Sequence, residues 1–227
     1  MNQNAVAAAM SDPTFYPSRP ESVEVIQTHI SWVFIAGDEV FKVKKAVDFG
    51  FLDFTTLEKR KFYCEEEVRL NRRLAPEVYL GVAEISLDRA GKIVLGRGET
   101  VLDYAVQMYQ IPADKMLKKL LLQGNFDSQI ITAVAQKLVH FHQQAETGGI
   151  IDETGGIETV RRNHEENFSQ TEPFIGLTLS AFRHGFIRSY AHKFLADQAN
   201  LFRKRVQEHK IRDCHGDLHL EHIVIAD

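Results

Sequence analysis

The chain has 227 residues, 44% of them hydrophobic and 26% charged, which is typical of a globular protein with one large core or two lobes. Its formal net charge of −4 argues against a general affinity for nucleic acids or anionic membranes. No apolar run approaches the roughly 20 residues that span a bilayer, and MNQNAVAAAMSDP lacks the basic start of a signal peptide. Two cysteines, Cys64 and Cys214, favour free thiols in a reducing cytoplasm. We therefore expect a cytoplasmic protein that binds neither nucleic acid nor membrane.

The first half of the sequence predicts strands around one helix, after an N-terminal extension at 1–20. VEVIQTHISWVFIAGDEVFKVKK predicts two or three strands with a tight turn at AGDE. TTLEKRKFYCEEEVRLNRRLAPE predicts a helix that begins with a capping box from Thr55 to Glu58 and ends before Pro76. VYLGVAEISL, IVLG and VLDYAVQMY then continue the sheet, with a turn at DRAGK.

The second half predicts helices, because after Pro112 the apolar spacing changes from about two to about 3.6 residues. ADKMLKKLLLQG and SQIITAVAQKLVHFHQQAE are amphipathic helical patterns, and glycine pairs at 148–149 and 155–156 mark loops. Between Ser180 and His209, apolar residues at helical spacings predict one long core helix. These residues are Phe182, Phe186, Tyr190, Phe194, Leu201 and Phe202.

This change of pattern predicts an α+β chain with two lobes. We expect a strand-rich N-lobe at 21–106, a hinge at 107–112 and a helical C-lobe at 113–227. A strand-rich lobe joined to a helical one is typical of a protein that binds its ligand in the cleft between them.

Two lysines on one predicted strand and a glutamate on the next helix indicate an ion pair. In EVFKVKK, period two places Lys42 and Lys44 on the same strand face. On the helix, steps of four, three and four residues define an apolar stripe that includes a carboxylate. The stripe consists of Tyr63, Glu67, Leu70 and Leu74. An unpaired carboxylate there would be costly. We expect Lys42 to pair with Glu67, with Lys44 as the substitute; the alternative is that these side chains are solvated.

The closing segment RDCHGDLHLEHIVIAD places an aspartate between a glycine and two histidines. His215 precedes Asp217 by two residues, and His222 follows it by five. A hydroxyl that attacks a phosphate must lose its proton and be oriented, and a carboxylate on a rigid loop does both. Protein kinases use the spacing His-x-Asp-x-x-x-x-Asn for this purpose. Gly216 permits a tight backbone, and HIVIA predicts a following strand. The alternative is that Asp217 only caps a turn.

RDCHGDLHLEHI resembles the His-Gly-Asp-x-x-x-x-Asn motif of the aminoglycoside phosphotransferase and choline kinase-like families. Over roughly residues 20–227, THISWVF, FGFLDF, CEEEVRLNRRLAPEVYL and HGDLHL look like a bacterial subgroup of uncharacterised phosphotransferase-like proteins. Members of that subgroup often continue into a separate P-loop kinase domain. The resemblance implies a protein kinase-like fold, with an antiparallel sheet and one helix in the N-lobe and a helical C-lobe. It also implies transfer of the γ-phosphate of ATP or GTP, with Mg²⁺, to a hydroxyl of a small molecule.

The resemblance implies roles for individual residues. Asp217 corresponds to the catalytic base, with His215 and Gly216 supporting the catalytic loop. Lys42 corresponds to the lysine that binds the phosphates, and Glu67 to the glutamate that orients it.

Further nucleotide contacts are implied at two places. Ser31, in QTHISW, matches a serine in the flap over the phosphates, although an ordinary turn serine would look the same. YAVQMYQIP resembles the hinge, where backbone groups of Gln107, Met108 and Tyr109 would contact adenine. Met108 and Tyr109 are equally typical of a core.

The main departure from the family pattern is His222, which stands in place of the asparagine. Imidazole binds divalent metals, but magnesium prefers oxygen ligands, so the metal-binding role of this position stays open. An alternative reading groups His215, His219 and His222 as a zinc site, because their spacings allow it.

The sequence after the motif is short. In the kinase plan a partner strand and a metal-binding aspartate follow, and Asp227 comes too early for that ligand and suits a hairpin turn. No G-x-x-x-x-G-K-[ST] occurs in the 227 residues. We therefore expect an N-terminal part of a longer protein, or a shortened product, with an incomplete C-lobe. The expected function is ATP-dependent phosphotransfer to a small-molecule hydroxyl, with a fused or associated P-loop kinase domain as the expected partner. The alternative is a non-catalytic nucleotide-binding or regulatory module.

Overall fold

A computed structural model describes residues 3–50, 52–124 and 127–225. Contacts divide the chain into two compact units, which we call the sheet unit (1–127 and 218–227) and the helical unit (128–217). This boundary at 127/128 differs from the predicted hinge at 107–112, and the division into two lobes at that hinge stays a prediction. The physical reason lies in backbone hydrogen bonds: Leu117 N donates to Ile223 O at 2.9 Å, and Ile225 N donates to Lys115 O at 2.9 Å. These bonds tie the predicted start of the C-lobe to residues of the sheet unit.

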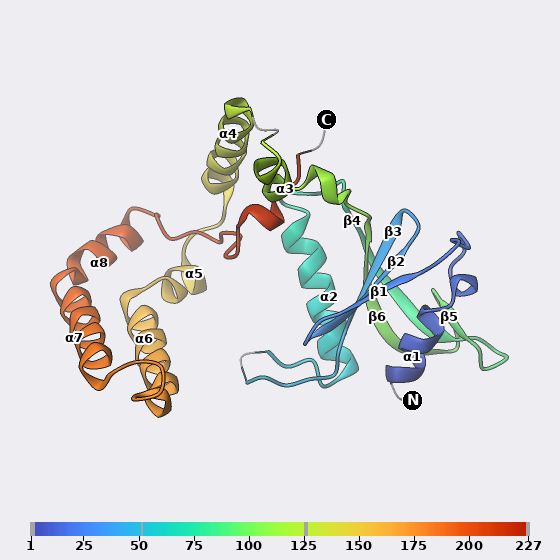
Figure 1. The fold of residues 1–227 in the computed structure, drawn as a ribbon, viewed down its shortest axis with the longest axis horizontal. Coiled ribbons are helices and arrows are strands. Elements are labelled where there is room, and N and C mark those ends of the chain that lie inside the picture. Colours follow the sequence, from blue (N-terminus) through green and yellow to red (C-terminus); the bar gives the residue numbers. More distant parts are fainter. Residues whose placement is uncertain (1–2, 51, 125–126, 226–227) are drawn as a thin grey trace. The chain divides into compact units, whose positions relative to one another are not determined.

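The sheet unit contains six antiparallel strands in the order β1-β2-β3-β6-β4-β5 (Figure 1). The strands are β1 (Glu24–Gln27), β2 (Ser31–Ala36), β3 (Glu39–Lys44), β4 (Tyr79–Leu87), β5 (Ile93–Leu95) and β6 (Thr100–Tyr109). The strands predicted between residues 23 and 109 are therefore confirmed, including the turn between β2 and β3, where Gly37 has a φ of +68°. Such a φ favours glycine because a side chain would meet the backbone.

The remaining elements of the sheet unit are helices. They are α1 (Gln3–Met10), η1 (Pro13–Phe15), α2 (Leu57–Asn71), η2 (Ala113–Lys115), α3 (Leu117–Leu122) and η4 (Leu220–His222). The chain therefore combines an antiparallel sheet with helices, as an α+β fold requires.

Helix α2 begins one residue later than predicted. Thr56 is the N-cap, and its Oγ1 accepts a hydrogen bond from Lys59 N at 3.2 Å, so the predicted cap at Thr55 is wrong. The buried stripe is also shifted, because Arg60, Cys64 and Val68 are the buried residues of this helix. Tyr63, predicted in the stripe, is 37% exposed.

The two faces of the sheet are covered by different helices. Helix α1 lies on one face, where Val6 and Met10 join a buried cluster with Phe34 and Phe41. Helix α2 lies on the other face, where Cys64, Val68, Tyr104 and Val106 form a second cluster. Residues 1–20, predicted as an extension, thus form part of the core where they are described. Tyr16 confirms this, since it is 1% exposed and donates its hydroxyl hydrogen to Met10 O at 2.6 Å.

A buried ion pair links α1, α2 and β6. Arg60 Nε donates to Asp103 Oδ1 at 2.8 Å, and the Asp103 side chain is fully buried. Gln3 Nε2 donates to the other carboxylate oxygen at 2.6 Å, and Arg60 Nη1 donates to Phe54 O at 3.1 Å. The carboxylate therefore has the hydrogen bonds that a buried charge needs.

The helical unit consists of short and medium helices. They are α4 (Ser128–Gln144), α5 (Gly149–Thr154), α6 (Ile157–Thr171), η3 (Glu172–Phe174), α7 (Ala181–Asp197) and α8 (Ala199–Gln207). Helix α6 packs against α5, α7 and α8. Within this unit Phe168 of α6 meets His184 of α7 edge-to-face, with ring centroids 5.6 Å apart.

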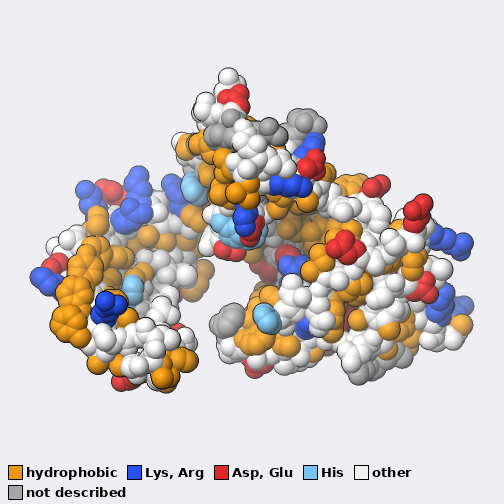
Figure 2. Space-filling model, in the orientation of Figure 1, with side chains coloured by type: hydrophobic (Ala, Val, Ile, Leu, Met, Phe, Trp, Pro, Cys, Tyr) orange, Lys and Arg blue, Asp and Glu red, His pale blue; other side chains and the backbone are white. Residues whose placement is uncertain are grey.

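The predicted long core helix is wrong in two respects. The helix is interrupted at Gln198, which separates α7 from α8. Its aromatic stripe is also exposed: Phe182, Phe186, Tyr190 and Phe194 are 82%, 64%, 65% and 44% accessible. Figure 2 shows hydrophobic side chains gathered over this helix. The residues of α7 that pack inward are His184 and Leu195 instead.

Across the described ranges 3–50, 52–124 and 127–225, the structure contains no helix that is both long and apolar enough to cross a membrane.

Candidate functional site

The predicted ion pair between β3 and α2 is confirmed. Lys42 Nζ lies 2.9 Å from Glu67 Oε1. Lys44 Nζ lies 2.6 Å from Glu67 Oε2, so the residue predicted as a substitute binds the same carboxylate. Both lysines reach α2 because alternate residues of a strand project to one face, and α2 covers that face. The opposite residues, Phe41 and Val43, lie in the cluster with α1.

The two lysines differ in accessibility. The Lys44 side chain is 6% exposed and its ammonium lies 4.9 Å from the centre of the Phe54 ring. The Lys42 side chain is 31% exposed, whereas that of Glu67 is 15% exposed. Lys44 is therefore a structural partner of the carboxylate, and Lys42 is the lysine that a bound anion can reach.

The electrostatics of this site favour an ionised carboxylate. Burial alone would raise the pKa of Glu67, but the ammonium groups of Lys42 and Lys44 outweigh it and hold that pKa below its ordinary value. Burial raises the pKa of the neighbouring Cys64 thiol to about 12. Burial and the Glu67 charge raise the pKa of Tyr79 to about 12. At neutral pH the Glu67 carboxylate is therefore ionised, whereas the Cys64 thiol and the Tyr79 phenol are neutral.

Ser31 does not lie in an open flap. It is the first residue of β2, is 1% exposed, and its backbone N donates to Thr28 Oγ1 at 2.9 Å. Its own Oγ is one of two buried side-chain oxygens in the described residues that have no hydrogen-bond partner, the other being Ser86 Oγ. The Ser31 amide is therefore already engaged in this conformation, and the implied contact of Ser31 with phosphate stays a prediction.

The predicted hinge residues lie within the central strand. Gln107, Met108 and Tyr109 belong to β6, which pairs with β3 on one side and β4 on the other. Tyr109 N donates to Val78 O at 2.9 Å. Residues 107–109 therefore lie in paired strand backbone, and their contact with adenine stays a prediction. The chain leaves the sheet only after Gln110, whose N donates to Asp38 O at 2.8 Å.

The segment before the predicted catalytic loop is anchored to the end of α4. Asp213 N donates to Glu146 O at 3.0 Å, and Arg212 Nη1 donates to Ala145 O at 3.2 Å. Gly216 then has a φ of +80°, which confirms the tight backbone expected at this position. Asp217 N donates to His215 Nδ1 at 3.3 Å, and the Asp217 side chain is exposed.

The strand predicted from HIVIA is wrong as far as the described residues go. Residues Leu220–His222 form the short helix η4, and Val224 makes a single antiparallel bridge with Met116. Asp227, predicted as a hairpin turn, lies outside the described residues.

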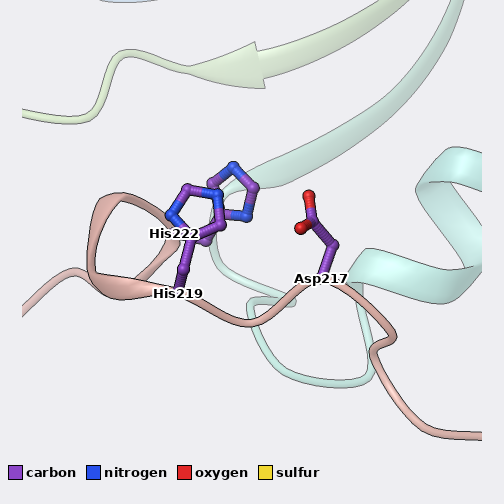
Figure 3. A group of neighbouring side chains, drawn as sticks. All are labelled: Asp217, His219 and His222. Carbon is purple, nitrogen blue, oxygen red and sulfur yellow. The ribbon is translucent and has the colours of Figure 1, made fainter. Parts of the chain in front are cut away.

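Three side chains of the loop converge. One ligand atom each from Asp217, His219 and His222 lies within 4.8 Å of the others, and all three residues are exposed. Figure 3 shows the carboxylate and both imidazole rings projecting to the same side of the loop. The zinc alternative is therefore corrected in its ligands, because Asp217 takes the place of His215 in the group. Spacing alone could not distinguish them, since it leaves side-chain direction open.

A hollow in the surface along α4 holds none of the predicted site residues. It is lined by residues of α4 alone, among them Ile131, Val139 and His140. A one-sided hollow of this kind cannot enclose a nucleotide, so we place no site there.

The chain is similar to uncharacterized proteins of Mycobacterium bovis and of two Mycobacterium tuberculosis strains. Each is 33% identical over 205 residues, which is 90% of this chain and 39% of the relative. The chain thus spans about two fifths of the length of the curated relatives it matches. No family model matches the sequence. No solved structure matches it either.

Proposed function

We propose that this chain carries the nucleotide-binding residues and the catalytic base of a small-molecule phosphotransferase. The reaction would transfer the γ-phosphate of ATP or GTP to a hydroxyl of a small molecule. The proposal includes a protein kinase-like fold and membership of the aminoglycoside phosphotransferase and choline kinase-like families. A P-loop kinase domain, fused or associated, is the proposed partner.

The observation that carries the proposal is the pairing of Lys42 with Glu67 at 2.9 Å. A strand lysine held by a helix carboxylate is the arrangement that kinase-like sites use for the α- and β-phosphates. Glu67 is mostly buried and stays ionised, and Lys44 shares its charge. The Glu67 carboxylate therefore holds the Lys42 side chain in place. The Lys42 side chain is still 31% exposed, so its ammonium can contact a phosphate oxygen.

Asp217 supplies the second part of the proposed chemistry. Its exposed carboxylate, on a backbone turned by Gly216, would accept the proton of the acceptor hydroxyl as the oxygen attacks phosphorus. The bond from the γ-phosphorus to the bridging oxygen breaks, and the nucleoside diphosphate leaves. In this proposal Asp217 orients the nucleophile as well as taking its proton.

The donors beside Asp217 do not fit magnesium. Mg²⁺ prefers oxygen ligands in octahedral geometry, whereas the neighbours of this carboxylate are the imidazoles of His219 and His222. We therefore derive no step through a magnesium ion at this position.

A second candidate function is a non-catalytic nucleotide-binding or regulatory module. The observation that favours it is His222, which stands where the resembled families have asparagine and lies in the imidazole cluster. This module would bind nucleotide through Lys42 without turning it over.

Turnover of Asp217→Asn in a longer protein that contains this chain separates the two functions. A positioned base contributes about 10²- to 10⁴-fold to rate, so we expect turnover to fall by at least about 100-fold. ATP affinity should be nearly unchanged, because the substitution keeps the shape of the side chain. The matched control is Asp114→Asn, an acidic residue of η2 outside the site. Equal turnover of Asp217→Asn and the parent would remove the catalytic role and favour the module.

A further inference from the structure

We propose that Asp217, His219 and His222 form a binding site for a divalent transition-metal ion of the zinc class. The site lies within a six-residue stretch, so its ligands come from one loop. One carboxylate oxygen and one nitrogen from each imidazole lie within 4.8 Å of one another. Zinc bonds to oxygen and nitrogen are about 2.0–2.2 Å long, so small side-chain rotations bring all three donors onto one ion.

The two imidazole rings of the group lie close together. The rings of His219 and His222 have centroids 3.8 Å apart and an interplanar angle of 40°. Each imidazole ring can offer one nitrogen lone pair to a metal, so two adjacent rings can bind the same ion. Imidazole also determines the class of ion, since it suits zinc, copper or nickel and not magnesium or calcium.

A hydrogen bond to one ring nitrogen of His219 leaves the other nitrogen as its candidate ligand atom. Its Nδ1 accepts a 3.3 Å hydrogen bond from Glu221 N and lies 4.0 Å from Glu221 Oε2. This leaves Nε2 as the metal ligand. When Nε2 binds a metal, the proton moves to Nδ1, which then no longer accepts the hydrogen bond from Glu221 N. The Glu221 carboxylate, 4.0 Å from Nδ1, must move closer to accept a hydrogen bond from that Nδ1–H. Carboxylates commonly orient metal-binding histidines in this way. Glu221 also pairs with Lys118 of α3, which ties the loop to a helix.

The ligand set leaves coordination positions open. Two histidines and one carboxylate give three protein ligands, and zinc normally takes four, so water or a substrate oxygen completes the sphere. All three residues are exposed, and an ion can enter directly from solvent.

The consequence for activity rests on the proposed function. A carboxylate that is bound to zinc cannot accept the proton of an acceptor hydroxyl. Occupancy of the site would therefore inhibit the proposed phosphoryl transfer by withdrawing Asp217. Zinc binding and turnover are separate measurements, so the metal site stands or falls independently of the proposed function.

A calorimetric titration of the metal-free 227-residue protein with ZnCl₂ tests the site. We expect one ion per chain, with affinity reduced by about tenfold or more in His219→Ala and in His222→Ala, since even outer-shell partners contribute about 10- to 100-fold. Asp217→Asn should also weaken binding. His140→Ala, on α4, is the matched control and should bind zinc as the parent does. Far-UV circular dichroism of each variant verifies that it is folded.

Cobalt substitution gives a second readout that does not depend on variants. Co²⁺ at the site should produce visible absorption bands that disappear when zinc is added. The assignment is overturned if the parent binds no zinc, or if His219→Ala and His222→Ala bind it like the parent. It is also overturned if His215→Ala weakens binding as much as His219→Ala, because the ligands would then be the three histidines.

Discussion

The two units differ in how their aromatic residues are used. In the sheet unit, Phe34 and Phe41 are fully buried between the sheet and α1. In the helical unit, the stripe that begins at Phe182 and ends at Phe194 recurs every four residues and is 44–82% exposed. Periodicity predicts correctly that these side chains share a face, but a shared face need not be covered. A helical pattern therefore establishes a stripe, and only contacts establish a core.

We expect the largest effect on the free energy of unfolding when an aromatic residue is replaced in the sheet unit. An equivalent replacement in the helical unit gives the contrast. Phe41→Ala should lower the free energy of unfolding by about 3–5 kcal/mol, because it leaves a cavity in the core. Phe186→Ala should change it by less than about 0.5 kcal/mol, because the ring is mostly exposed. Trp32 is the single tryptophan and lies on β2, so its fluorescence during urea unfolding reports the sheet unit. Circular dichroism at 222 nm follows the helices. A loss of stability in Phe186→Ala as large as that in Phe41→Ala would mean that the stripe is buried.

A smaller effect concerns the charge of Glu67 within the sheet unit. Its pKa is lowered, so its contribution to stability is present above the unfolded-state pKa, near 4.5, and is lost as pH falls through the folded-state pKa. Glu67→Gln should lower stability at pH 7 by about 2 kcal/mol, because two ammonium groups lose their ionised partner.

The difference in stability between Glu67→Gln and the parent should therefore shrink as the pH is lowered below about 4.5. Exposed carboxylates with lowered pKa values are present in both proteins, so their pH-dependent contributions to the free energy of unfolding cancel in this difference. Glu65→Gln, on the exposed side of α2, is the control. A difference that stays constant with pH would show that Glu67 is not held ionised by its lysines.

The sequence predicts local features of the sheet unit well and the boundaries of its elements less well. Strand period and glycine turns identify every strand, and the spacing in EVFKVKK and on α2 identifies the Lys42–Glu67 pair. The same spacing could not predict which of the two lysines is more accessible, since both face α2. Thr55 and Thr56 are equally good caps, so the sequence does not choose between them.

Other features depend on contacts that a linear pattern does not contain. The alanine-rich start of the chain becomes core because Gln3 and Met10 find partners in the sheet. Ser31 N and Tyr109 N donate to Thr28 and Val78, and a strand pattern does not identify these partners. The grouping of Asp217 with His219 follows from side-chain directions, which sequence spacing alone does not fix.

The measurement that tests the central claim most directly is ATP binding by Lys42→Met, determined by calorimetry on the 227-residue protein. We predict that the parent binds ATP and that the affinity of Lys42→Met is lower by about tenfold or more, because a charge-assisted hydrogen bond to phosphate contributes about 1.5–3 kcal/mol. Lys61→Met, an exposed lysine of α2, should bind ATP like the parent. Equal affinity of Lys42→Met and the parent, or no ATP binding by the parent, would contradict the assignment of this ion pair as a nucleotide site.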